Sequence, residues 1–174
     1  MTTTTLYRFK IDLSDIDRGV YEQLDFRLAQ HPSETLQYLL TRAIAYVLNF
    51  QDGLEFSTQG LADPDAPALQ INTSNGVELA IEIGNPSAKR LHKTSKNAKR
   101  VRVYTYKDPE VLLAEVRTET IHRAETIEVY AIDPKFLDRL AKELPRSINW
   151  NIMMQEGTLS IADEQTEIRK FNLG

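Results

Sequence analysis

Alternation of apolar and polar residues predicts a series of β-strands along the chain. In Thr4–Leu13 every second residue from Tyr7 to Leu13 is apolar, as in a strand with one buried face. Tyr21–Gln30 alternates in the same way, so we expect these two segments to pair as a hairpin. Further strands are expected at Leu54–Thr58, Ala68–Asn72, Val77–Ile83, Val101–Tyr106, Thr126–Ala131, Ser147–Met154, Thr158–Ala162 and Thr166–Asn172.

A helical period appears between some of these strands. From Leu36 to Leu48 apolar residues recur every three or four positions, which predicts an amphipathic helix at Glu34–Phe50 with Ser33 as its N-cap. A second helix, rich in lysine and arginine, is expected to begin at Pro86 with Asn85 as its cap. Two shorter helices are expected at Asp108–Val116 and Pro134–Leu144.

The order of these elements predicts an α/β (α+β) fold, in which one mixed central β-sheet is flanked by helices. The length of 174 residues suits a single domain over residues 1–174. Val77–Ile83, the basic helix and Val101–Tyr106 are expected to form a right-handed crossover between two parallel strands.

Composition places the chain among soluble globular proteins, with 41% hydrophobic and 26% charged residues. The chain contains no cysteine, which excludes disulfides, thiol catalysis and zinc–thiolate sites. Its apolar runs are shorter than the ~20 residues that span a membrane. The N-terminus lacks the charged and apolar regions of a signal peptide. We therefore expect a cytoplasmic protein that does not bind a membrane.

One acidic residue and one basic segment carry the candidate chemistry. Glu82 stands inside an apolar run, where a carboxylate is costly to bury unless a cation or a proton neutralises it. The segment Gly84–Lys107 that follows holds eight of the chain's 21 lysines and arginines and no acid. Two interpretations are open. Glu82 forms a salt bridge on a half-exposed strand beside a solvated helix, or a metal and a phosphate meet here.

The position of Asp65 relative to Glu82 depends on the hairpin turn that precedes the basic segment. If Thr73–Gly76 is a four-residue loop, Asn72 faces Val77 and Asp65 lies close to Glu82. A two-residue turn moves Asp65 farther from Glu82. The Asn75-Gly76 pair is typical of a hairpin turn.

The basic residues of the helix recur at spacings of three and four, which predicts a stripe of Lys89, Lys93, Lys96 and Arg100. The net charge of −4 argues against a protein covered by nucleic acid, but it allows a local basic surface. The three histidines are scattered, so a metal would be held by oxygen atoms, which favours magnesium or manganese.

Four segments together resemble the YaeQ family, and they cover nearly the whole chain. They read HPSET, GLADPDAPAL, ELAIEIGNPSAKRLHKTSKNAKRVRVYTY and IMMQEGTLSIAD. The resemblance implies a fold similar to the PD-(D/E)XK nucleases, with a restriction-endonuclease-like core and a cluster of metal-binding carboxylates.

The resemblance also implies roles for individual residues. Glu34, Asp65 and Glu82 would hold a magnesium or manganese ion. Gly84 stands where these nucleases carry their lysine, and the resemblance implies that Lys93 of the following helix replaces it. The expected phosphate-binding residues are Lys89, Arg90 and Lys96.

The leading hypothesis is a metal-dependent phosphodiesterase that acts on DNA or RNA, with Lys93 stabilising the charge of the transition state. The alternative is a nuclease-like fold without catalysis, which binds nucleic acid or an acidic protein partner through its basic helix. The sequence leaves the oligomeric state open.

Overall fold

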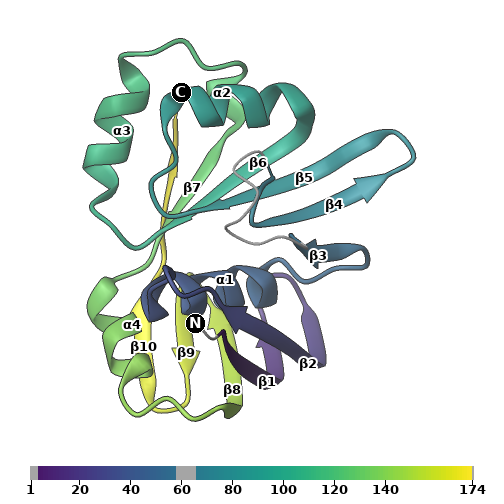
Figure 1. The fold of residues 1–174 in the computed structure, drawn as a ribbon, viewed down its shortest axis with the longest axis vertical. Helices are drawn as coiled ribbons and strands as arrows, with labels where there is room; N and C mark the ends of the chain where they lie inside the picture. The colour runs from purple at the N-terminus through teal and green to yellow at the C-terminus, as the bar shows by residue number, and fades with distance from the viewer. Residues whose placement is uncertain (1–3, 58–65, 174) are drawn as a thin grey trace. The chain divides into compact units, whose positions relative to one another are not determined.

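The computed structural model describes residues 4–57 and 66–173, in which four α-helices accompany two mixed β-sheets (Figure 1). The chain divides into two compact units. Unit 1 is Met1–Leu48 with Ile132–Ile168, and unit 2 is Asn49–Ala131 with Arg169–Gly174. The predicted mixed α/β composition is confirmed, but the prediction of one central sheet is wrong because each unit contains its own sheet. The single domain over residues 1–174 stays a prediction.

Unit 1 contains a five-stranded sheet in the order β10-β9-β8-β1-β2. β1 and β2 form the predicted antiparallel hairpin, and β1 pairs on its other side with β8 in parallel. The strands predicted at Ser147–Met154 and Thr158–Ala162 are confirmed as β8 and β9, which pair antiparallel. The strands are β1 (Thr5–Asp15), β2 (Val20–Gln30), β8 (Ser147–Gln155), β9 (Thr158–Ile161) and β10 (Glu164–Glu167).

One face of this sheet is buried, and the alternation in β1 accounts for it. Tyr7, Phe9, Ile11 and Leu13 are all buried. The helices of unit 1 are α1 (Leu36–Leu48) and α4 (Pro134–Ala141), and they contact each other. Helix α1 also contacts β2, and α4 also contacts β10.

Helix α1 begins two residues later than predicted, because Thr35 rather than Ser33 provides its cap. The Tyr38 N–H donates to Thr35 Oγ1 at 3.1 Å. The Ser33 hydroxyl instead lies 2.7 Å from His31 Nδ1.

Unit 2 contains a six-stranded sheet in the order β11-β7-β6-β5-β4-β3. The strands on either side of the basic helix α2 pair in parallel, as predicted for a crossover. The predicted final strand is divided, since β10 joins the sheet of unit 1 and β11 pairs with β7. The elements are β3 (Leu54–Phe56), β4 (Leu69–Thr73), β5 (Gly76–Ile83), α2 (Ala88–Asn97), β6 (Ala98–Thr105), α3 (Pro109–Arg117), η2 (Ala124–Thr126), β7 (Glu128–Ala131) and β11 (Arg169–Asn172).

The turn between β4 and β5 combines features of the two predicted registers. Thr73 pairs with Gly76, so the turn has two residues, yet Asn72 faces Val77 as in the first register. A bulge between Ile71 and Asn72 then shifts the rest of the ladder by one residue. Asp65 lies outside the described residues, so its predicted proximity to Glu82 stays a prediction.

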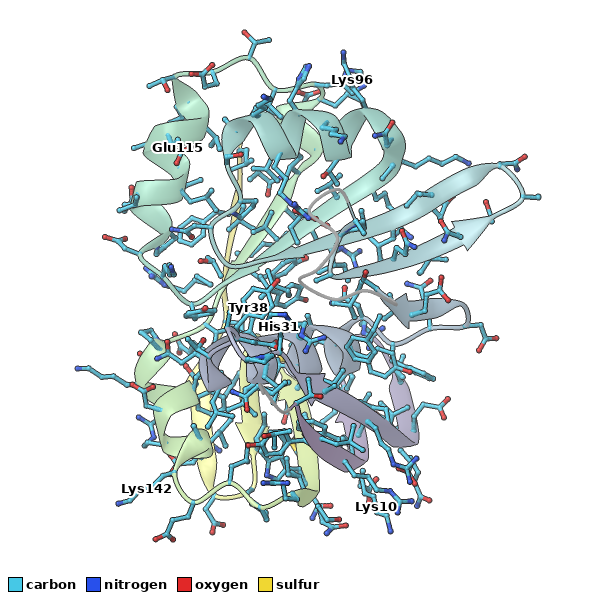
Figure 2. All side chains as sticks on the ribbon, in the orientation of Figure 1. Lys10, His31, Tyr38, Lys96, Glu115 and Lys142 are labelled. Carbon is cyan, nitrogen blue, oxygen red and sulfur yellow. The ribbon has the colours of Figure 1, made fainter. Side chains whose placement is uncertain are left out.

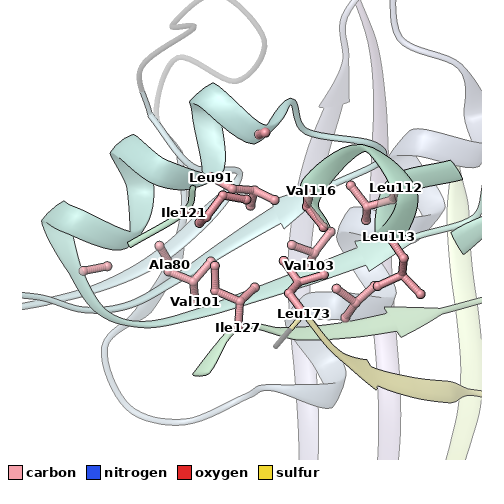
Figure 3. Packing of buried hydrophobic residues seen from close by; sticks show 13 residues of the cluster. Ala80, Leu91, Val101, Val103, Leu112, Leu113, Val116, Ile121, Ile127 and Leu173 are labelled. Atoms are coloured by element: carbon pink, nitrogen blue, oxygen red, sulfur yellow. The ribbon is translucent and has the colours of Figure 1, made fainter. Parts of the chain in front are cut away.

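The core of unit 2 lies between the sheet and the helices α2 and α3 (Figure 3). Leu91 of α2 is fully buried, and Ala88 and Ser95 lie with it on the buried side of the helix. β6 contributes Val101 and Val103 to the same core. This packing holds α2 against the sheet, because its mostly polar sequence offers little other apolar surface to bury.

Leu91→Ala should lower the free energy of unfolding by about 2–5 kcal/mol, because it leaves a cavity under α2. Lys96→Ala, on the exposed side of the same helix, should change this free energy by no more than about 0.5 kcal/mol. Urea denaturation of both variants and the wild type measures the difference. Equal effects of the two substitutions would contradict the packing described here.

Candidate functional site

Glu82 is a buried acid near the end of β5. Its side of the strand does not face solvent, because all five residues at 79–83 are buried and Glu82 itself is 2% exposed. The interpretation of a half-exposed strand is therefore wrong, although the salt bridge that accompanied it is present. Burial raises the pKa of Glu82 above its ordinary value of 4.5, and hydrogen bonding and attraction to Arg90 offset part of that rise.

Arg90 of α2 neutralises the Glu82 carboxylate. Its Nε donates to Glu82 Oε2, and its Nη2 lies 3.4 Å from Oε1. The same Nη2 donates to the Ala66 carbonyl at 2.7 Å. The guanidinium predicted to grip phosphate is thus already shared between a buried carboxylate and a backbone oxygen.

The start of α2 positions this arginine. Ser87 is the N-cap, and its hydroxyl accepts a hydrogen bond of 3.1 Å from the Arg90 N–H. The predicted cap, Asn85, is wrong because its Oδ1 accepts instead from the Thr105 hydroxyl at 2.8 Å. Arg90 follows the cap by three residues, so it lies in the first turn of the helix.

The remaining lysines of α2 lie on its exposed side. We call Lys89, Lys93 and Lys96, which are all exposed, the α2 basic face. Figure 2 labels Lys96 at the surface of this helix. Arg100 does not belong to it, because α2 ends at Asn97 and Arg100 lies in β6, so that part of the predicted stripe is wrong.

Other cations of the basic segment are paired by acids from outside it. Lys99 Nζ lies 3.3 Å from Glu78 of β5, and Arg102 Nε lies 3.1 Å from Glu128 of β7. The segment itself contains no acid, so its sequence did not reveal that Lys99 and Arg102 form ion pairs with acids of neighbouring strands.

Glu34 in unit 1 is bound in the same manner as Glu82 in unit 2. Arg42 Nε donates to Glu34 Oε2 at 2.8 Å, and Arg42 Nη2 donates to Oε1 at 2.9 Å. The His31 N–H also donates to Oε1 at 3.0 Å. Sequence reasoning missed Arg42. The available signal was an arginine among the apolar residues of an amphipathic helix, eight positions after an acid.

The structure describes two of the three predicted metal ligands, Glu34 and Glu82. Glu34 and Glu82 belong to different units, and each carboxylate is occupied by an arginine. Across residues 4–57 and 66–173, no group of three potential metal ligands of the His, Cys, Asp or Glu types is found. The predicted ion, and the roles of Glu34, Asp65, Glu82 and Lys93 around it, stay predictions.

A model of the YaeQ protein family matches residues 1–170. The chain belongs to the YaeQ family. The YaeQ protein of Escherichia coli strain K12, an uncharacterized protein, is 25% identical over 167 residues, which are 94% of this chain and 91% of that protein.

Two solved structures of the family share the fold. The YaeQ protein of Pseudomonas syringae is 34% identical, with a TM-score of 0.86 over 98% of this chain and 96% of that one. The YaeQ protein of Xanthomonas axonopodis pv. citri is 27% identical, with a TM-score of 0.87 over 98% of each chain. Within the part of this chain that the structure describes, no helix is long and apolar enough to cross a membrane.

The raised pKa of Glu82 predicts how pH changes the stability of the protein. The folded state holds the Glu82 proton more tightly than the unfolded chain does, so the stability contributed by this proton is fully present below about pH 4.5. It is lost as pH rises through the raised pKa. The stability of the wild type relative to Glu82→Gln should therefore fall as the pH rises above about 4.5.

Urea denaturation across this range measures that difference, and Glu119→Gln, which changes an exposed acid of the same unit, is the control. The difference between the wild type and the control should stay constant. A constant difference for Glu82→Gln as well would contradict the proposed effect of burial.

Proposed function

We propose that this member of the YaeQ family binds the phosphate backbone of nucleic acid through the α2 basic face, without cleaving it. The same proposal includes a nuclease-like fold that binds nucleic acid but does not catalyse its cleavage. The observation that carries it is the clustering of cations on one helix. Lys89, Lys93 and Lys96 are all exposed on α2, which contains no acid.

The dimensions of this face suit a phosphate backbone. Lys89 and Lys96 are seven residues apart, which is about 10 Å along a helix that rises ~1.5 Å per residue. One DNA strand places a phosphate every ~3.4 Å along its axis, so the face spans about three such steps. Contacts of this kind carry little sequence information.

The arginine pairs argue against cleavage through the predicted metal. An ion bound by Glu82 would have to displace Arg90, which already compensates the charge of this buried carboxylate. Glu34 is held more completely, because its carboxylate accepts from the His31 N–H as well as from Arg42. Both acids therefore have a structural partner that competes with a metal.

A metal-dependent phosphodiesterase is the second candidate, favoured by the burial and raised pKa of Glu82. Acids with strongly perturbed pKa values are concentrated at catalytic sites. In that case Glu34, Asp65 and Glu82 would hold magnesium or manganese, and Lys93 would stabilise the phosphate charge.

Replacing Lys89, Lys93 and Lys96 together with alanine should weaken binding to DNA or RNA roughly tenfold or more. Each lost phosphate contact should also reduce the slope of log affinity against log salt by about 0.9 on duplex DNA and 0.7 on single strands. Fluorescence anisotropy with labelled single-stranded and duplex oligonucleotides, at several salt concentrations, measures both effects.

The matched control replaces three exposed lysines of unit 1, Lys10, Lys135 and Lys142, with alanine. It changes the net charge by the same amount, and its affinity and salt slope should stay close to those of the wild type. Equal losses in both triple variants would show that net charge, rather than the α2 basic face, determines binding.

Titration with manganese separates the two candidate functions. If binding without cleavage is correct, calorimetry should give the same heats for the wild type and Glu82→Ala, and magnesium should not induce cleavage of labelled DNA or RNA. Manganese binding that is lost in folded Glu82→Ala, together with magnesium-dependent cleavage lost in the same variant, would establish the phosphodiesterase instead.

A further inference from the structure

The sheet of unit 1 ends on one side in an unusually long edge strand. β2 has 11 residues and pairs only with β1, whereas the strand at the opposite edge, β10, has four. Figure 1 shows β2 as the outermost strand of this sheet. Its pairing with β1 runs without a bulge from Val20 to Gln30, and it contains no proline. It therefore lacks two devices that commonly protect an edge from pairing.

The centre of β2 has a symmetrical pattern about Phe26. Leu24 and Leu28 lie on one side of the strand and are buried, with the half-buried Phe26 between them. Asp25 and Arg27 lie on the other side and are exposed. Read in either direction, the order is leucine, charge, phenylalanine, charge, leucine, and the two charges are opposite in sign.

We propose that a second copy of this chain pairs with β2 in an antiparallel manner, with Phe26 of each copy at the two-fold axis. Residues directly opposite each other in an antiparallel pair share a face of the sheet. Asp25 then faces Arg27 of the second copy, and Leu24 faces Leu28 of the second copy. The two-fold symmetry repeats each of these contacts, so the dimer interface contains two ion pairs.

Neighbouring registers are less favourable, and this makes the pairing specific. Moving the axis to Asp25 places two carboxylates opposite each other, and moving it to Arg27 places two guanidinium groups opposite each other. A shift of one residue in the pairing brings the buried side of one strand against the exposed side of the other. The register centred on Phe26 avoids both conflicts.

Asp25 can accept a second arginine. Arg8 already donates to it through Nε at 3.0 Å and Nη2 at 2.7 Å, but the Asp25 side chain remains 50% exposed. A carboxylate offers about four acceptor positions, and Arg8 uses two of them. Arg27 is exposed on the same side of β2. The dimer is independent of the α2 basic face, which lies in the other unit.

Charge reversal tests the dimer in the full chain. The wild type should sediment above its monomer mass of 19.9 kDa as its concentration is raised. Asp25→Arg and Arg27→Asp each place like charges opposite each other and should raise the dimer dissociation constant about tenfold or more. The double variant restores opposite charges in the same register and should recover dimerisation.

Asp12→Arg is the matched control, because Asp12 is an exposed acid of β1 and β1 is not an edge strand. It should leave the dissociation constant unchanged. A wild type that stays monomeric at every concentration, or a dimer that tolerates each single reversal, would overturn the proposal. A double variant that is folded by circular dichroism but does not recover dimerisation would overturn it as well.

Cross-linking tests the register without depending on charge repulsion. The chain has no cysteine, so Asp25→Cys and Arg27→Cys each introduce a single thiol on an exposed side chain. Opposite Cβ atoms lie about 4.5–5.5 Å apart and diagonal ones about 7–8 Å, and a disulfide needs about 3.5–4.5 Å.

A mixture of the two cysteine variants should therefore form a disulfide-linked dimer on mild oxidation, and either variant alone should form much less. Equal yields in all three samples would overturn the register. No product in any of them would overturn the pairing of β2 with β2.

Discussion

The ion pair between Glu82 and Arg90 joins an interior strand of the unit 2 sheet to the helix that carries the basic face. A carboxylate this deeply buried would be unfavourable without a cation, and the arginine that serves it comes from the first turn of α2. Leu91, the next residue, is buried in the core below the helix. The ion pair and the apolar contact together fix the rotation of α2, so its lysines face away from the sheet.

Unit 1 uses the same arrangement at the start of α1. Glu34 and Arg42 are eight residues apart, as are Glu82 and Arg90, and both arginines lie on helices. Buried ion pairs add less to stability than their short distances imply, because desolvation offsets much of the attraction. They are specific, however, since removing one partner leaves a buried charge. The two acids that most resemble metal ligands in the sequence are thus bound by structural partners within the protein.

The sequence predicted individual elements better than their assembly. The alternation in β1 and the helical period of α1 are determined by neighbouring residues, and both elements are present, with α1 two residues shorter at each end than expected. The division into two sheets was not predictable in this way, because it depends on β8 pairing with β1, more than 100 residues away. The bulge in β4 is equally invisible in the sequence, because no residue there requires it.

At the candidate site, too, the sequence predicted some features from neighbouring residues and missed others that depend on contacts between separate elements. The exposure of the α2 lysines followed from their spacing, whereas the sequence left open whether Glu82 is buried. The sequence also did not identify the residue that neutralises Glu82, because several cations follow it within one helix. The cap at Ser87 sets where α2 begins, and Arg90 of its first turn reaches the carboxylate. A one-residue change in where this helix begins would turn its faces by about 100° and redistribute the roles of its cations.

Each copy carries one α2 basic face, so a dimer formed through β2 would carry two. A nucleic acid long enough to reach both would make its second contact as an intramolecular step, with a gain in affinity that no single face provides. A short oligonucleotide fills one face and gains nothing from the dimer. The two proposals therefore remain separable, because reversing the charge of Asp25 removes the linkage between faces and leaves each face intact.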